Sequence, residues 1–172
     1  MKGVIVFSFA WRKEGHSPCN VRLAKAAIRI VRELEKSGEM VVVVAQRTTA
    51  AVMEELGLSV DLVIQKRAGY EGSEEVVAQA DEWFKTYGIN GDRITKVIPV
   101  ANPFIHLFKC IQLVQKKGFK TLSFWKLARM IGWIGFDRRS EQPATRGPIR
   151  LVFYTARQVL FGYRNPVEQS EP

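Results

Sequence analysis

The sequence predicts an α/β protein built as a three-layer αβα sandwich around a mostly parallel sheet of about five strands. Short runs of β-branched residues recur along the chain, and each is followed by a stretch with helical periodicity. The runs lack strict alternation of apolar and polar residues, which is typical of strands covered on both faces. At 172 residues the chain is long enough for one domain with a substantial core.

The strands are expected where the β-branched runs occur. They are residues 3–9, 40–45, 60–65 and 94–101, with a fifth strand at 121–125. The first helix should run from a cap at Asn20 to about Ser37, with Leu23, Ala27 and Ile30 on its apolar face. Further helices are expected at 48–56, 73–87, 104–117 and 149–161, and residues 126–148 should be irregular. Residues 1–164 thus form a single domain, and 165–172 a loose tail.

The net charge of +9 is unevenly distributed along the sequence. Residues 1–86 contain 12 Lys and Arg against 12 Asp and Glu, whereas residues 87–172 contain 14 against 5. Such asymmetry indicates an anionic partner, which could be a phosphate ligand, a nucleic acid or a membrane surface. A basic solvated face that aids solubility is the alternative.

Targeting signals and cysteine spacing favour a cytoplasmic protein. No apolar run reaches the roughly 18 residues needed to span a bilayer. The first strand begins almost at Met1, which leaves no room for a signal peptide. Cys19 and Cys110 lie far apart, as expected of free thiols in a reducing compartment.

Polar residues follow four of the expected strands. These loops are residues 10–20, 46–49, 66–72 and 102–106. Carboxyl ends of parallel strands meet at one edge of a sheet, and ligands bind there. Helix N-termini at that edge attract anions. The sequence therefore predicts a small-ligand site formed by these loops.

His106 and Lys109 are the leading candidates for chemistry at this edge. His106 could act as acid, base or phosphate contact, and Lys109 one helical turn later could hold a phosphate. Asn102 and Ser73 could bind the ligand or serve as helix caps. The remaining rim candidates are Arg22, His16 and Arg47.

The motifs of several enzyme classes are missing. The sequence contains no GxGxxG, Walker A, GxSxG or HExxH pattern, which argues against ordinary dinucleotide-binding, NTPase, esterase and metalloprotease sites. His16, Cys19, His106 and Cys110 lack the close pairing typical of zinc ligands, so no metal is expected.

Residues 118–139 interleave aromatic and basic side chains. Such a segment could stack nucleobases while holding phosphates, or lie on an anionic membrane. The favoured interpretation is a strand and loop whose Trp125, Trp133 and Phe136 fill the core.

The order of motifs resembles the SanA/ElyC/YdcF-like family, a bacterial domain family with a Rossmann-like fold. The resemblance extends from about Gly3 to Gly162. It rests on Ser17-Pro18 leading into Arg22-Leu23, the strand at 41–44, Gly72-Ser73-Glu74-Glu75 opening a helix, His106-Leu107-Phe108-Lys109, and the late Glu141.

The resemblance implies a phosphate-bearing or nucleotide-like ligand, with a nucleotide or S-adenosyl-methionine as a possible cofactor. It adds Glu74 and Glu141 to the ligand-binding residues, and phosphoryl transfer or hydrolysis with His106 as acid or base to the candidate activities. The chain departs from the family in three places. It has Ala45-Gln46-Arg47 in place of Ser-Gly-Gly and Lys109 in place of arginine. Where the family has threonine before a Glu-Asn pair, it has Ser73 and lacks the asparagine. The competing function is binding of nucleic acid or an anionic membrane without catalysis.

Overall fold

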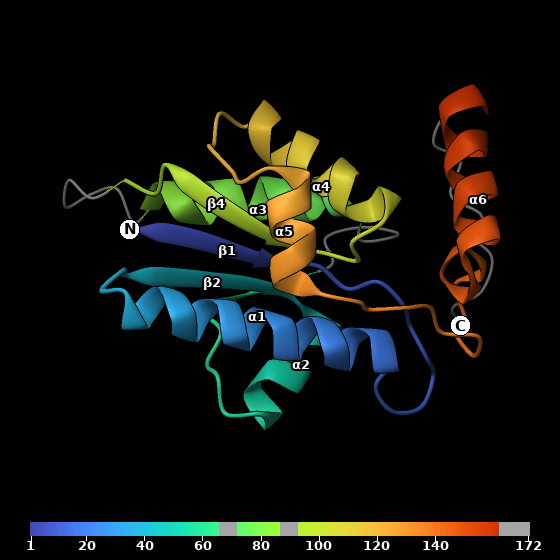
Figure 1. Ribbon diagram of the computed structural model, residues 1–172, viewed down its shortest axis with the longest axis horizontal. Coiled ribbons are helices and arrows are strands. Elements are labelled where there is room, and N and C mark those ends of the chain that lie inside the picture. The colour runs from blue at the N-terminus through green and yellow to red at the C-terminus, as the bar shows by residue number, and fades with distance from the viewer. Residues whose placement is uncertain (66–71, 87–92, 162–172) are drawn as a thin grey trace.

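A computed structural model of the chain describes residues 1–65, 72–86 and 93–161, except for the side chains of 157–161. It confirms the α/β sandwich (Figure 1). The sheet has four parallel strands in the order β3-β2-β1-β4. These strands are β1 (Lys2–Val6), β2 (Val41–Gln46), β3 (Leu62–Ile64) and β4 (Lys96–Val100).

Helices cover both faces and one edge of this sheet. They are α1 (Pro18–Lys36), α2 (Arg47–Glu55), α3 (Ser73–Thr86), α4 (Ile105–Lys116), α5 (Phe124–Ile131), the 3₁₀ turn η2 (Pro143–Arg146) and α6 (Pro148–Phe161). In Figure 1, α1 and α2 lie on one side of the sheet and α3 and α4 on the other. Helix α5 packs beside β4, between α1 and α4, and α6 stands at one end next to η2.

The central strands form the core because both of their faces are covered. Ile5 of β1 pairs in register with Val44 of β2 and with Pro99 of β4. Ile5 and Val44 are completely buried, as is Phe7 directly after β1. Each fully buried aliphatic or aromatic side chain contributes roughly 1.5–3 kcal/mol through removal from water. Burial on both faces also explains why the strand sequences do not alternate.

The predicted fifth strand at 121–125 is wrong. Only Lys120 forms a bridge with β4, through Lys96, and the chain then turns into α5. Leu127 and Ile131, four residues apart, point into the core, so the apolar pattern has a helical rather than a strand period. Helix α5 ends at Gly132, whose φ of 77° suits glycine. Residues 126–148 are thus less irregular than expected.

The cap of the first helix lies three residues before the predicted one. Ser17 is its N-cap and accepts a hydrogen bond from the Cys19 N–H, with Pro18 in the first turn. Asn20 therefore lies inside the helix rather than capping it. The other predicted helices agree with α2, α3, α4 and α6 to within two residues at each described end.

Two aromatic residues expected in the core are on the surface. Trp125 is 79% exposed and Trp133 is 75% exposed, whereas Phe136 is half-buried against Phe9. The expected tail at 165–172 lies outside the described residues. No helix in the described part of the chain combines the length and hydropathy needed to cross a bilayer.

Gly3 is required where α3 passes over β1. A Cβ atom at this position would lie 2.7 Å from Phe84 Cζ and 3.2 Å from Ile94 Cγ2. Gly3→Ala should therefore destabilise the fold by about 1–3 kcal/mol, because the buried Phe84 ring must move. Urea denaturation measures this loss. Gly147→Ala is the matched control, since no described atom lies within 4 Å of the Cβ that this change would add. An equal loss in both variants would contradict the steric explanation.

Candidate functional site

The strand order creates a switch point between β1 and β4. From β1 the chain moves to β2 and β3 on one side, and it then crosses to β4 on the other side of β1. In open α/β sheets, ligands bind outside the carboxyl ends of the strands at such a switch point, where the flanking loops separate. The residues that follow β1 and β4 therefore define the candidate site.

His106 and Ser73 meet at this site. Ser73 is the first residue of α3, and His106 lies in the first turn of α4. Ser73 Oγ lies 3.2 Å from His106 Nε2, at hydrogen-bonding distance. The hydrogen bond joins two segments that are 33 residues apart, because α3 and α4 both begin at the carboxyl edge of the sheet.

The His106 imidazole is held among aromatic rings. Its ring stacks on Phe9, with centroids 5.7 Å apart, and meets Phe7 edge-on at 5.8 Å. Burial, and to a smaller extent the positive charge of Lys109, lowers the pKa of His106 from 6.5 to about 4. The imidazole is therefore neutral at pH 7. Within the described residues Nδ1 is buried and has no hydrogen-bond partner, which leaves one polar atom of the ring unsatisfied.

Cys110 and Lys109 complete the surroundings of this pair. The Cys110 thiol is completely buried, and burial raises its pKa despite a hydrogen bond with Ser73, so it stays protonated. Lys109 Nζ lies 3.7 Å from Glu74 Oε1, and both side chains are in contact with solvent. The N-terminal parts of α3 and α4 thus contribute a hydroxyl, an imidazole, an ammonium and a carboxylate to one region.

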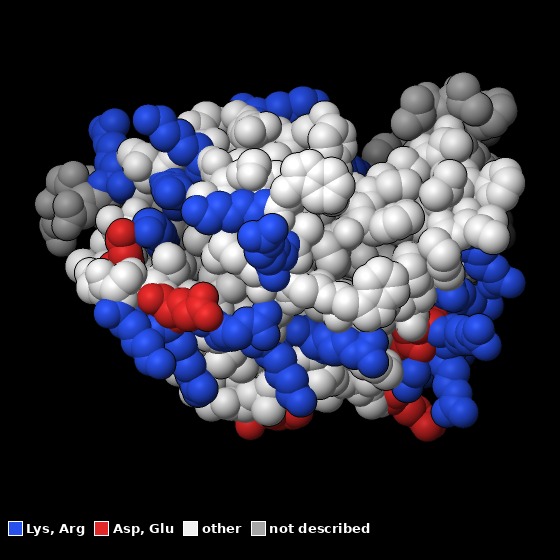
Figure 2. Space-filling view, in the orientation of Figure 1, with Lys and Arg blue, Asp and Glu red and all other residues white. Residues whose placement is uncertain are grey.

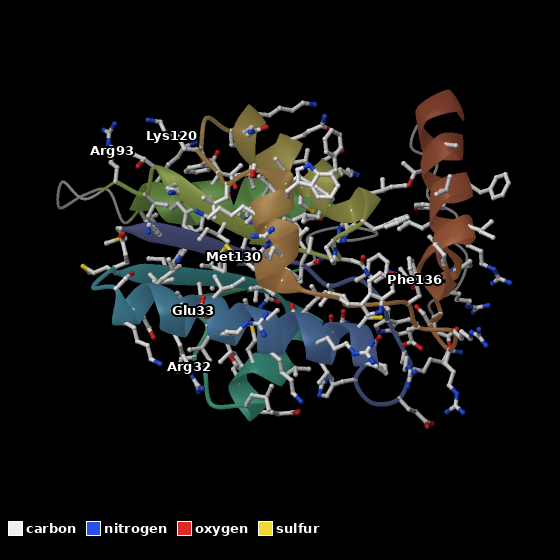
Figure 3. The ribbon with its side chains drawn as sticks, in the orientation of Figure 1. Arg32, Glu33, Arg93, Lys120, Met130 and Phe136 are labelled. Carbon is white, nitrogen blue, oxygen red and sulfur yellow. The ribbon has the colours of Figure 1, made fainter. Side chains whose placement is uncertain are left out.

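Asn102 and Arg22 are engaged with the segment that follows α5. The buried Asn102 amide donates to the Gly135 carbonyl at 2.8 Å, and Arg22 Nη1 donates to the Ile134 carbonyl at 2.8 Å. Phe136, labelled in Figure 3, follows these residues and contacts Phe9. In this arrangement Asn102 and Arg22 position the chain beside the site.

Asn20 organises the loop after β1, a role that the sequence analysis missed. Its Oδ1 accepts from the Phe9 N–H at 2.9 Å and the Ala10 N–H at 3.4 Å, and its Nδ2 donates to the Ala10 carbonyl at 2.6 Å. Nδ2 also lies 3.3 Å from Thr48 Oγ1. Ser8, which precedes Phe9, forms a hydroxyl–hydroxyl hydrogen bond with Thr48 and donates its N–H to the side-chain oxygen of Gln46. The ends of β1 and β2 are thereby tied to α1.

Arg12 and Asp137 form a second connection that the sequence analysis did not predict. Two guanidinium nitrogens donate to the two carboxylate oxygens at 2.6 and 2.7 Å, over a separation of 125 residues. The hydrogen bonds from Arg12 are the main cause that lowers the pKa of Asp137 below its ordinary value, and burial opposes this effect. Pairing of distant residues through a bidentate ion pair leaves no local signal in a sequence.

The remaining predicted ligand residues lie apart from the Ser73–His106 pair. His16 Nε2 lies 3.0 Å from Glu55 in the last turn of α2. Arg47 is exposed at the start of α2, and the exposed Glu141 donates its backbone N–H to the Trp11 carbonyl. The loop predicted at 66–72 lies outside the described residues except for Gly72.

The described residues contain no group of three or more His, Cys, Asp or Glu that could hold a metal ion. Cys19 and Cys110 are both buried free thiols.

Comparison with known proteins identified no matching family model, no similar curated protein and no similar solved structure.

Proposed function

We propose that this protein binds a small anionic ligand, phosphate-bearing or nucleotide-like, at the carboxyl edge of its sheet beside Ser73 and His106. The observation that carries the proposal is the hydrogen bond between these two residues at the switch point of the sheet. Ser73 and His106 are half-buried, and a buried imidazole nitrogen without a hydrogen-bond partner is costly for stability alone. Such arrangements are common where a ligand supplies the missing contacts.

Helix dipoles and Lys109 attract an anion to the pair, and the carboxylates of Glu74 and Glu75 in the first turn of α3 act against them. The first turns of α3 and α4 present the positive ends of two helix dipoles, and among the described residues no side-chain hydrogen bond caps α4 at Phe104. Lys109 adds an ammonium one turn along α4, where it can bind a phosphate oxygen as a point charge. The hydroxyl of Ser73 can donate to the same oxygen group. The resemblance to the SanA/ElyC/YdcF-like family supports this ligand class, and membership of that family is part of the proposal.

The protonation state of His106 favours binding over acid–base catalysis. A base with a pKa of about 4 accepts a proton weakly at pH 7, where a catalytic base works best near the ambient pH. In Ser–His catalytic pairs a third group orients the second ring nitrogen, whereas Nδ1 of His106 has no partner among the described residues.

Both free thiols are buried, which suits a protein of the reducing cytoplasm.

Ligand titration tests the proposal. Inorganic phosphate, adenosine monophosphate and S-adenosyl-methionine serve as probes in calorimetry and thermal-shift assays of the full chain. At least one of them should bind, and Lys109→Ala should weaken that binding by about tenfold or more through loss of a charged contact. Ser73→Ala should weaken it less, since a neutral hydrogen bond contributes about 1 kcal/mol.

Lys116→Ala is the matched control, because Lys116 is an exposed lysine in the last turn of the same helix. It removes the same charge without touching the first turn of α4. Equal weakening by Lys109→Ala and Lys116→Ala, or no binding of any probe, would refute the site. Release of phosphate from a nucleotide, abolished by His106→Gln, would instead assign His106 a catalytic role.

A further inference from the structure

Helix α1 carries a stripe of basic side chains on its solvent-exposed side. They are Arg22, Lys25, Arg29, Arg32 and Lys36. Their spacing of three or four residues places them on one face of the helix. Figure 2 shows a row of blue side chains over the position of α1, in the lower half of that view. Although the first half of the sequence is neutral overall, five of its 12 Lys and Arg residues are thus gathered on one face.

The outer face of α5 lies next to this stripe. Arg29 Nη2 donates to the Met130 carbonyl at 2.6 Å, which joins α1 to the end of α5. Trp125, Lys126 and Arg129 are all exposed, on the side of α5 opposite the buried Leu127. In Figure 3, Met130 comes from α5 and Arg32 and Glu33 from the neighbouring α1. The basic face thus consists of the α1 stripe, these three α5 residues and Trp133.

Both tryptophans of the basic face lie beside cations. Trp125 and Arg129 are four residues apart on α5 and therefore neighbours. Trp133 Nε1 and Arg22 Nη1 both lie close to Gly135, at 3.4 and 3.1 Å from its Cβ position. The indoles are 79% and 75% exposed, so most of their apolar surface faces water.

A hollow of about 420 Å³ runs along the α1 stripe. Its lining consists of Lys25, Ile28, Arg29, Arg32, Glu33, Lys36 and Leu56. Four cations against one carboxylate make it a suitable place for a phosphate-bearing group, and Ile28 and Leu56 add apolar surface. The combination of a hollow lined by cations and projecting indoles matches a lipid bilayer, whose headgroups are charged and whose interior is apolar.

We propose that the basic face docks on an anionic phospholipid surface, with Trp125 and Trp133 inserted at the level of the headgroups. Tryptophan is enriched at membrane interfaces because its ring is apolar and its N–H is polar. Lysine and arginine near an anionic bilayer add electrostatic attraction. Shallow insertion at the interface needs no membrane-spanning helix.

A bilayer explains the basic face better than a nucleic acid does. Single-stranded nucleic acids lie in basic grooves with aromatic rings along the floor. Here the indoles project, and residues 124–136 contain no Asn, Gln, Ser or Thr that could hydrogen-bond a base edge. The same residues contain no Asp or Glu to repel a lipid phosphate.

Co-sedimentation of the full chain with vesicles tests the proposal. The protein should bind phosphatidylserine–phosphatidylcholine vesicles and not pure phosphatidylcholine vesicles, and binding should fall as salt rises. Lys126→Ala with Arg129→Ala should lower the partition coefficient about 25-fold, since each cation contributes about fivefold. Trp125→Ala with Trp133→Ala should lower it about tenfold or more through lost apolar burial.

Matched variants separate this face from the overall charge of the protein. Lys13→Ala with Arg150→Ala removes two exposed cations outside the basic face, and Phe153→Ala removes an exposed ring from α6. These controls should bind anionic vesicles within about twofold of the unchanged protein, because surface substitutions away from a contact have small effects. Quenching of the unchanged protein's tryptophan fluorescence by bromine-labelled lipid adds a readout that needs no variant.

Equal losses in the controls and the basic-face variants would overturn the proposal. Absence of binding to anionic vesicles would also overturn it, as would binding to oligonucleotides at a salt concentration where vesicles are not bound. The outcome is independent of the Ser73–His106 site, since none of these substitutions touches that pair.

Discussion

The protein should lose about 3 kcal/mol of folding free energy between pH 7 and pH 4 through His106 alone. In the folded state its pKa is lowered to about 4, whereas an unfolded chain has a histidine pKa near 6.5. Between these values the unfolded state binds one more proton, so stability falls as the pH falls. The difference between the two pKa values sets the size of the loss, because each unit corresponds to about 1.4 kcal/mol. The stabilisation is fully present above pH 6.5 and fully lost below about pH 4.

Urea denaturation at several pH values measures this effect. His106→Gln removes the titrating group, so the stability difference between the two proteins should shrink steeply below pH 6.5. His16→Gln is the control, because it removes the other histidine of the chain and leaves His106 in place. A histidine resonance titrating near pH 6.5 in both the unchanged protein and His16→Gln would disprove the lowered pKa.

Asn20→Ala should lower the free energy of unfolding by about 3 kcal/mol, a large effect for one small polar side chain. The change removes the acceptor for the Phe9 and Ala10 N–H groups and the donor to the Ala10 carbonyl. These backbone groups are buried, and each one left unsatisfied costs about 1–3 kcal/mol. The loss should appear as a lower urea midpoint with an unchanged slope.

Glu35→Ala is a suitable reference for Asn20→Ala, because Glu35 is exposed in the same helix and should change stability by less than about 0.5 kcal/mol. Thr48→Val should have an intermediate effect, since Thr48 contacts both Asn20 and Ser8 but supports no backbone N–H. An Asn20→Ala protein as stable as Glu35→Ala would show that water replaces the amide without cost.

The sheet and most helices could be predicted because their signals are local. Runs such as Val41–Val44 are buried on both faces, and Ser73 with Glu74 begins a helix where the dipole favours acids. The strand predicted at 121–125 was wrong because a short apolar run fits both a strand and a helix period. The helix is identified by Leu127 and Ile131, which lie further along the chain. Ser17 and Asn20 are both good cap residues, so sequence alone did not choose between them.

The site could be predicted only in outline. Topology brings His106 and Ser73 to one edge, and this followed from the order of strands and helices. The partners of Asn102, Arg22 and Asp137 come from segments between 33 and 125 residues away, and no local pattern encodes such contacts. The α1 stripe was overlooked because acids elsewhere in residues 1–86 cancel its charge in any count along the chain.

Among the described strands β4 pairs with β1 alone, and the sequence of β4 limits what can pair with its open side. The N–H of Val97 on that side donates to the Lys120 carbonyl at 2.8 Å. The next position facing outward is Pro99, which has no N–H to offer. A strand of a second chain could not pair with this side of β4, because the first N–H donor is already bonded and the second is absent. Helix α5 also packs alongside. The β4 border of the sheet is therefore protected against the intermolecular strand pairing that leads to fibrous aggregates.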